Sequence, residues 1–457
     1  MAMIKEETAE PLITQSWFRF KALLGKLRSD VVELGSKVKK LGQEDPRRVI
    51  HSFKVGLAIA LVSQIYYFEP LYQGFGVAAM WAVLTVVVIF EFTVGATLGK
   101  GINRGIATFL GGALGVGAHR LAGFSGERFE PIVLGLSVFL VAAVVTFLRF
   151  FPKMKARYDY GLMIFILTFS LICVSGYQDD EVLDMAHRRL STILIGSTVA
   201  VLVCISICPV WAGDDLNTLL VSNLEKLADF LDEKDDEYTG FGAQYFNSSG
   251  SGQPEDVQAY KSVLNSKNTE ESLVNFAKWE PRHGQFKYRH PWEQYLKIGG
   301  LTRQCANIIE ALNAYLSCSN NQTAHEIRAK IQEPCTKISS ESSHALKELA
   351  LAMKTMTRPS TANSYIVNAG VAAQDLKSLL KTGLWLPETG LLEVIPTTTV
   401  ASLLLDVVTC SEKIAESVNE LASLAYFKNA GRRLSKQETL RPSPPIQEHH
   451  YLSTTAE

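Results

Sequence analysis

The sequence lacks the features that mark several classes of protein. Its 45 basic and 46 acidic residues leave a net charge of −1, and no basic stripe interleaved with aromatic residues is present, so we expect no nucleic-acid partner. Seven cysteines in 457 residues do not make a disulfide framework. A phosphate-binding P-loop, a two-histidine zinc-protease helix and a Gly-x-Ser-x-Gly elbow are all absent from the sequence. We therefore expect neither an enzyme nor a bound cofactor.

Charge is also scarce in one third of the chain. Residues 51–210 hold only 20 of the 91 charged residues. Six long apolar runs fall in or beside this block, at about residues 49–68, 74–92, 94–118, 131–151, 159–176 and 188–210. As a helix, each run is long enough to cross a hydrocarbon core of about 30 Å. The sequence therefore predicts a transmembrane domain of six helices over residues 49–210, in contact with a lipid bilayer.

Basic residues near the ends of the runs predict the orientation. Residues 1–48 form a polar arm without the apolar core of a signal peptide, and this arm carries nine basic residues from Arg19 to Arg48. Four more basic residues follow the fourth run, whereas the loops after the first and fifth runs contain acidic residues and no basic ones. The positive-inside rule places both termini in the cytosol. We accordingly interpret residues 1–48 as a cytosolic N-terminal arm.

The second half of the chain is polar and carries helical patterns. Residues 211–457 contain 24 basic and 30 acidic residues and no further run of spanning length. Leucines recur at helical spacing from Leu216 to Leu231, and similar patterns follow in three later stretches. We expect an all-α membrane protein in which a helical cytosolic domain, residues 211–430, follows the six transmembrane helices. A flexible insertion at about 232–254 and a disordered tail at 431–457 complete the predicted organisation.

Two cations occupy an unexpected place in the third run. If the run is centred near Ile106, Arg104 lies about 3 Å from the midplane and Lys100 about 9 Å. A cation at that depth costs roughly 2.5 to 3.5 kcal/mol, so both side chains should face a wet cavity or a partner rather than lipid. Their i, i+4 spacing places them on one face, as in an anion pore. The alternative is that they pair with buried acids such as Glu91 and hold the bundle together.

Other charged residues near the runs have two interpretations each. Arg188 and Arg189 open the sixth run, where they either reach the headgroups or line the outer half of a pore. The loop before them is an extracellular site for a hard cation or a solvated surface, and we leave the identity of any metal open. Its acidic residues are Asp179, Asp180, Glu181 and Asp184. Lys54 is expected to be an interfacial anchor.

The sequence resembles a known family, the aluminium-activated malate transporters of plants, which are also called quick-activating anion channels. The resemblance rests on residues 45–51 (DPRRVIH), 80–83 (MWAV) and 91–105 (EFTVGATLGKGINRG). Residues 278–284 (KWEPRHG) resemble the cytosolic WEP motif of the family, which corresponds here to Trp279, Glu280 and Pro281. The match covers most of the chain.

The resemblance implies a homodimer with an anion pathway between the subunits and malate and other anions as permeants. It also implies that Arg104 and Arg189, and with them Lys100 and Arg188, line this pathway. Residues 205–216 resemble the segment that is linked to GABA sensitivity in the family, which makes a regulatory segment the interpretation here. This segment includes Pro209, Trp211, Asp214 and Asp215. The first outer loop adds only Glu69 to the acidic loop, so we do not expect aluminium to be the trigger.

We therefore expect an anion channel that passes malate down its electrochemical gradient. A proton- or cation-coupled organic-anion transporter and a membrane-anchored scaffold or sensor are the alternatives. The expected location is a plant membrane, with the plasma membrane favoured and the vacuolar membrane as the other choice.

Overall fold

The computed structural model describes residues 12–68, 79–126, 128–175, 182–232, 260–287, 289–318, 325–382 and 391–429. Within these ranges the chain is helical, and its β-structure consists of two isolated bridges, His283 with Phe286 and Thr357 with Lys428. The helices divide between two compact units, residues 1–209 and 210–457. The predicted tail and, beyond Asp232, the predicted insertion lie outside the described residues, as do Asp179, Asp180 and Glu181.

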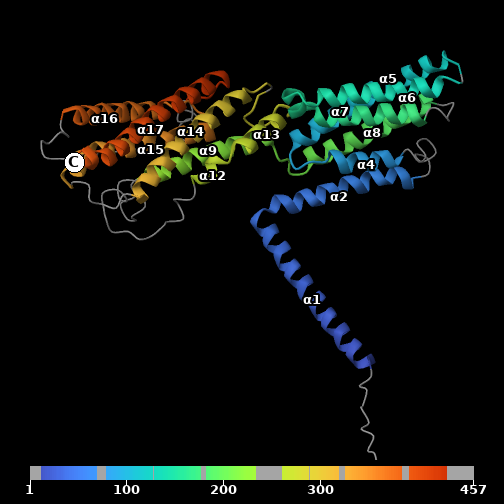
Figure 1. The fold of residues 1–457 in the computed structure, drawn as a ribbon, viewed down its shortest axis with the longest axis horizontal. Coiled ribbons are helices and arrows are strands. Elements are labelled where there is room, and N and C mark those ends of the chain that lie inside the picture. Colours follow the sequence, from blue (N-terminus) through green and yellow to red (C-terminus); the bar gives the residue numbers. More distant parts are fainter. Residues whose placement is uncertain are drawn as a thin grey trace, which may run out of the picture. The chain divides into compact units, whose positions relative to one another are not determined.

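The first unit begins with a long polar helix and continues as a bundle (Figure 1). Its helices are α1 (Leu12–Glu44), α2 (Pro46–Tyr67), α4 (Met80–Ile89), α5 (Val94–Gly123), α6 (Glu130–Leu148), α7 (Pro152–Ser175) and α8 (Val182–Ser206). Asp45 separates α1 from α2, and its side chain accepts from the Arg47 amide while Pro46 occupies the first turn of α2. Helix α5 packs against α7 and α8, and α8 also contacts α2 and α4.

Four helices in the described part are long and apolar enough to cross a membrane. They are Pro46–Tyr67, Glu130–Leu148, Pro152–Ser175 and residues Ala186–Ser206 of α8. These four correspond to the first, fourth, fifth and sixth predicted runs. Helix α4 is shorter, with 10 residues, and the start of its predicted run lies outside the described residues. Helix α5 has 30 residues, but its internal cations and many glycines make it less apolar.

The second unit is a helical bundle that begins with α9 (Ala212–Leu231). Its other helices are α12 (Lys261–Leu264), α13 (Lys267–Ala277), α14 (Trp292–Cys318), α15 (His325–Thr355), α16 (Ala362–Thr382) and α17 (Leu391–Leu424). Leu216, Leu220, Leu224, Leu227 and Leu231 are completely buried. The predicted leucine spacing thus forms the core face of α9, which packs chiefly on α15. The sequence patterns did not predict α12, α13 and α16.

Candidate functional site

A non-helical break between α4 and α5 positions the acidic end of the candidate site. Thr93 caps α5 by accepting a hydrogen bond from the Ala96 amide at 3.3 Å. One turn later, Thr97 Oγ1 accepts from the Glu91 amide at 3.0 Å and donates to the Glu91 carbonyl at 3.2 Å. These bonds tie the backbone of Glu91 to the first turn of α5. The Glu91 carboxylate therefore lies beside Lys100 of that helix.

Lys100 is paired rather than free. Its Nζ donates to Glu91 Oε1, and its ammonium lies 5.7 Å from the ring centroid of Tyr160 on α7. Both members of the ion pair are about one-third exposed. The alternative interpretation, in which a cation of the third run pairs with Glu91, therefore matches the surroundings of Lys100.

Arg104 lies one turn further along α5 and has different surroundings. Arg104 is 4% exposed, and its Nη1 donates a hydrogen bond to Tyr160 Oη at 3.0 Å. Its Nε is buried and has no hydrogen-bond partner, and no carboxylate of the described residues forms an ion pair with it. A guanidinium stays protonated in proteins and carries five N–H donors. Arg104 thus retains unused hydrogen-bonding capacity and an uncompensated charge within the bundle.

Arg189 on α8 provides a second buried guanidinium. It is 9% exposed, and its Cζ lies 4.0 Å from the centroid of the Trp81 ring on α4. A cation at this distance over an aromatic face is attracted by the ring quadrupole, which does not neutralise its charge. Arg189 lies on α8, which packs against α5, the helix that carries Arg104. The structure therefore places two of the predicted pathway cations, Arg104 and Arg189, in buried positions on neighbouring helices.

Arg188 is directed elsewhere. Its Nε lies 2.6 Å from Asp184 Oδ2 one turn earlier on α8, and both side chains are over two-fifths exposed. Of the four acidic residues predicted as a cation site, Asp184 is the one within the described residues. Its carboxylate forms an ion pair with Arg188. Among the described residues, no group of three or more His, Cys, Asp or Glu side chains could hold a metal ion.

Glycines explain how α5 approaches the helix that carries Tyr160. A Cβ added at Gly111 would lie 2.9 Å from the Phe165 carbonyl oxygen, and one at Gly115 would lie 3.0 Å from Ile172 on the same helix, α7. Nearer to Tyr160, Asn103 Nδ2 donates to the Arg157 carbonyl of α7 at 3.1 Å. The small-xxx-small pair Gly111/Gly115 therefore permits the close contact that holds Arg104 against Tyr160.

Lys54 is a buried residue that the sequence interpretation misplaced. We expected an anchor among the lipid headgroups, but Lys54 is 1% exposed and its Nζ donates to the Cys208 carbonyl at 3.2 Å. Cys208 has a φ of 40°, in the left-handed region, two residues after α8 ends. The ammonium therefore binds the carbonyl where the last span finishes. The low charge of the surrounding sequence was the signal that could have placed Lys54 inside the bundle.

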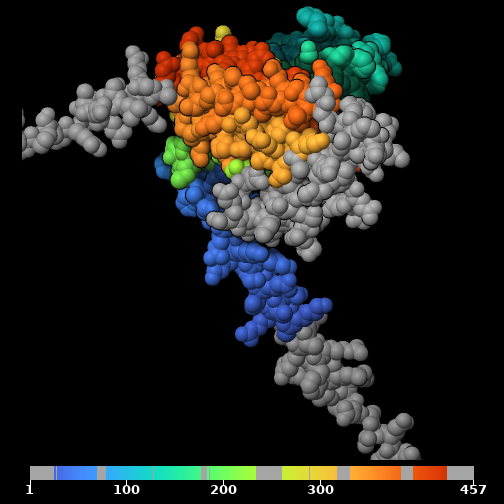
Figure 2. Space-filling model, turned by 90° about the vertical axis from the view of Figure 1, so that its left-hand side faces the viewer, coloured from blue at the N-terminus to red at the C-terminus, as the bar shows by residue number. Residues whose placement is uncertain are grey.

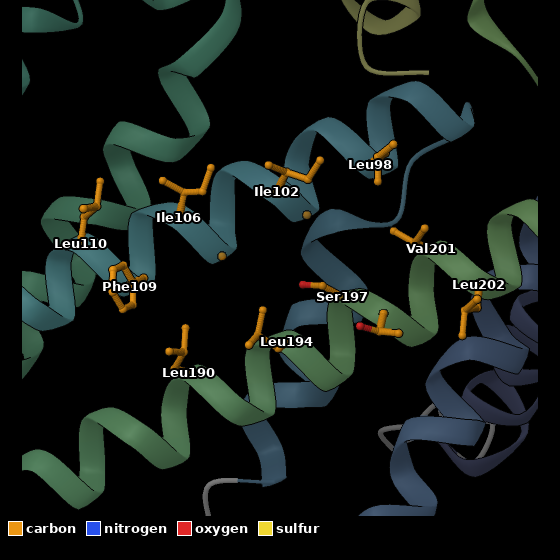
Figure 3. A pocket seen from close by; sticks show the side chains of 13 residues that line it. Leu98, Ile102, Ile106, Phe109, Leu110, Leu190, Leu194, Ser197, Val201 and Leu202 are labelled. Carbon is orange, nitrogen blue, oxygen red and sulfur yellow. The ribbon is translucent and has the colours of Figure 1, made fainter. Parts of the chain in front are cut away.

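The first unit also has an apolar groove, which is distinct from the positions of these cations. The groove lies between α5 and α8 and has a volume of about 610 Å³. Figure 3 shows Ile102 and Ile106 of α5 on one side of it and Leu194 of α8 on the other. None of the four predicted pathway cations lines the groove. Its apolar walls offer no counter-charge for a carboxylate, whereas Arg104 and Arg189 are buried inside the bundle.

The WEP motif performs a definite task in the second unit. Glu280 Oε1 accepts from the Ala212 amide at 2.6 Å, and Oε2 accepts from the Gly213 amide at 3.1 Å. Trp211, at the N-cap of α9, offers no side-chain cap of its own, so Glu280 satisfies the exposed amides of that helix end. Trp211 instead stacks on His283, with ring centroids 4.0 Å apart. Burial raises the pKa of Asp214 in the first turn of α9.

These contacts join the motif and the nearby His283 to Trp211, Ala212 and Gly213 of the predicted regulatory segment at residues 205–216. A profile of the family described as "Aluminium activated malate transporter" matches residues 39–387. The chain belongs to the aluminium-activated malate transporter family. Its apolar helices and this membership make it a multi-pass membrane protein.

Individual members of the family are similar along most of the chain. Aluminum-activated malate transporter 2 of Arabidopsis thaliana is 53% identical over 406 residues, which cover 87% of this chain and 79% of the relative. Aluminum-activated malate transporter 1 of Triticum aestivum is 47% identical over 416 residues, 89% of each chain. Aluminum-activated malate transporter 10 of Arabidopsis thaliana is 40% identical over 460 residues, 91% of this chain and 90% of the relative.

Proposed function

We propose that this protein is an anion channel that passes malate and other organic and inorganic anions across a plant membrane. The observation that carries the proposal is the pair of buried guanidinium groups, Arg104 and Arg189, which have no carboxylate partner among the described residues. The names of the relatives, aluminum-activated malate transporters, support malate as a permeant.

The electrostatics of the pair favour an anion as the missing partner. A buried cation without a carboxylate partner is costly, and here two such cations lie on helices that pack against each other. A carboxylate that enters between them would accept hydrogen bonds from guanidinium N–H groups and compensate the positive charge. The same field would exclude cations, as charged rings do in anion pores. Lys100 contributes less to this field because Glu91 compensates its charge.

The rest of the arrangement is also a proposal. We place six spans, including α4 and α5, in the membrane, with residues 1–48 and the second unit in the cytosol. Two copies form the channel, and the plasma membrane is the favoured location. Imaging of a tagged full-length chain in plant cells tests the location, and protease protection of the termini tests the orientation.

Patch-clamp recording of the full-length protein tests the conduction mechanism. We expect Arg104→Ala and Arg189→Ala to reduce malate current and the preference for anions over cations. Arg120→Ala removes the same charge from an exposed position in the last turn of α5 and should leave both unchanged. Malate current and anion selectivity that survive Arg104→Ala at wild-type surface levels would show that the guanidinium pair is not the pathway.

Reversal potentials separate a channel from a coupled transporter. For a channel, the reversal potential follows the anion gradient alone. A shift with an imposed proton or sodium gradient would instead identify coupled transport. Absence of anion current in liposomes that contain the purified protein would favour a scaffold or sensor.

A further inference from the structure

Helix α1 carries a row of large apolar side chains that the described part of the chain leaves uncovered. Val31, Leu34, Val38 and Leu41 are 66%, 61%, 60% and 46% exposed. Figure 2 draws the described part of α1 in blue. Exposed apolar side chains in a contiguous row mark an interaction surface. The polar composition of residues 1–48 concealed this row in the sequence interpretation.

The spacing of the row identifies the kind of partner. The four positions are separated by three, four and three residues, and the same alternation continues upstream in the sequence. Its earlier members are Ile13, Trp17, Phe20, Leu24 and Leu27. This is a period of 3.5 residues over four heptads. A straight α-helix drifts by about 20° per heptad from that period, so the row stays on one side only if the helix supercoils around another helix.

The residue types along the row favour two parallel strands. From Leu27 to Leu41, the a positions of the heptad are Val31 and Val38, and the d positions are Leu27, Leu34 and Leu41. Branched residues at a with leucine at d are typical of parallel two-stranded coiled coils. Two copies in one membrane present their α1 helices from the same side and in the same chain direction. A second copy therefore supplies a helix of the required sequence and polarity.

The charges beside the row allow this pairing. In a parallel pair, the g residue of one helix lies near the e residue of the next heptad on the other. Asp30 would meet Gly35, and Lys37 would meet Gly42, so neither pair brings like charges together. The small e residues also permit close approach.

A bilayer surface fits the row less well. Lys26, Lys39 and Lys40 would be attracted to anionic headgroups. An interfacial helix, however, buries a broad apolar face of about 100° or more, whereas an a/d row is narrower. Here the row is bordered by Asp30, Lys37 and two glycines.

We propose that α1 pairs with α1 of a second copy of this chain as a parallel two-stranded coiled coil. The proposal deepens the homodimer of the proposed function by assigning it a contact outside the membrane helices. It does not depend on anion conduction.

Cysteine cross-linking of the full-length protein in membranes tests the contact. Leu34→Cys and Val38→Cys place thiols at d and a positions, where facing Cα atoms come within the range that a disulfide spans. Ser36→Cys is the matched control, because residue 36 is an exposed f position on the opposite side of α1. Under mild oxidation we expect at least a fivefold larger fraction of covalent dimer for the first two variants than for Ser36→Cys or the unmodified chain.

Two further variants keep the cross-linking cysteine at position 38 and introduce a lysine either in the apolar row or on the opposite side of α1. In a Val38→Cys chain, Leu34→Lys should reduce the dimer fraction to the Ser36→Cys level, whereas Ser36→Lys should leave it unchanged. Equal cross-linking at positions 34 and 36, or none at positions 34 and 38, would overturn the proposal. In the latter case, quenching of a fluorophore at position 34 by brominated lipids in anionic vesicles would identify the bilayer as the occupant.

Malate current recorded from the same variants before oxidation keeps the two proposals separate. Current without cross-linking at position 34 or 38 would contradict the coiled coil alone. Cross-linking without any anion current would contradict the channel alone.

Discussion

The Nη1 group of Arg104 donates to Tyr160 Oη at 3.0 Å and so links α5 to α7. The phenol ring that receives this bond also lies beside the ammonium of Lys100. One side chain of α7 therefore contacts both Lys100 and Arg104 of α5. The orientation of the free part of the Arg104 guanidinium depends on this contact.

Removal of the Tyr160 hydroxyl should weaken anion selectivity while the bundle remains folded. Hydrogen bonds to charged groups contribute about 1.5 to 3 kcal/mol, so Tyr160→Phe should release Arg104 and lower the malate-to-chloride permeability ratio several-fold. Tyr158→Phe is the control, since Tyr158 is 37% exposed on the same helix. Permeability ratios from reversal potentials provide the measurement. Equal ratios for both variants would mean that Tyr160 does not position Arg104.

A methyl group at Gly111 should destabilise the membrane unit. The added Cβ would lie 2.9 Å from the backbone oxygen of Phe165, so α5 and α7 must separate. Overpacking of this kind costs about 1 to 3 kcal/mol. Gly117→Ala is the control on the same helix, because nothing lies within 4 Å of its added Cβ. Thermal denaturation in detergent should show a lower Tm for Gly111→Ala than for Gly117→Ala, and the reverse order would contradict the close packing.

Loss of the Glu280 carboxylate should destabilise the start of α9. Glu280→Ala leaves the amides of Ala212 and Gly213 without their acceptor, at a cost of about 1 to 3 kcal/mol. Glu293→Ala removes a carboxylate whose side chain is 73% exposed and serves as the control. Chemical unfolding, monitored by tryptophan fluorescence, should show a lower midpoint for Glu280→Ala alone. An unchanged midpoint would show that other acceptors or water replace the carboxylate.

Acid should destabilise the second unit through His290. Burial, with the nearby charges of His283 and Lys287, lowers the pKa of His290 from 6.5 to about 4. Between these values the unfolded chain binds a proton that the folded chain does not. The free energy of unfolding therefore falls as pH decreases from about 6.5 to about 4, by about 3 kcal/mol at most.

Replacement of His290 should reduce this acid sensitivity. Denaturant midpoints of His290→Gln should change less between pH 7 and pH 5 than those of the unmodified protein. His344→Gln replaces an exposed histidine of α15 and should retain the original slope. Parallel slopes for all three proteins would exclude His290 as the source of the pH dependence.

The local sequence predicted individual helices better than it predicted which helices pack against one another. The apolar runs predicted α6 and α7, and the leucine spacing predicted the buried face of α9, because burial and helical period are written in consecutive residues. The depth of Arg104 in its run likewise indicated that this cation avoids lipid. Its partner was not predictable, since Tyr160 lies 56 residues away and the contact depends on how α5 packs on α7.

Cations that the sequence pattern did not distinguish have different partners in the structure. Lys100 and Arg104 share a helix face by spacing, but a break after α4 brings Glu91 to Lys100, while Arg104 meets a phenol. Arg188 and Arg189 are adjacent, but successive residues of a helix point about 100° apart. Arg188 therefore pairs with Asp184, and Arg189 lies over Trp81.

The sequence by itself determined that this chain has an apolar, charge-poor block and a polar helical half, and that cations lie where lipid would reject them. Hydrophobicity and period are local properties, so consecutive residues suffice to read them. Only the tertiary structure decided which of those cations are compensated, that Lys54 binds the end of α8, and that Glu280 caps α9. Each of these depends on atoms from segments far apart in the chain, which packing alone brings together.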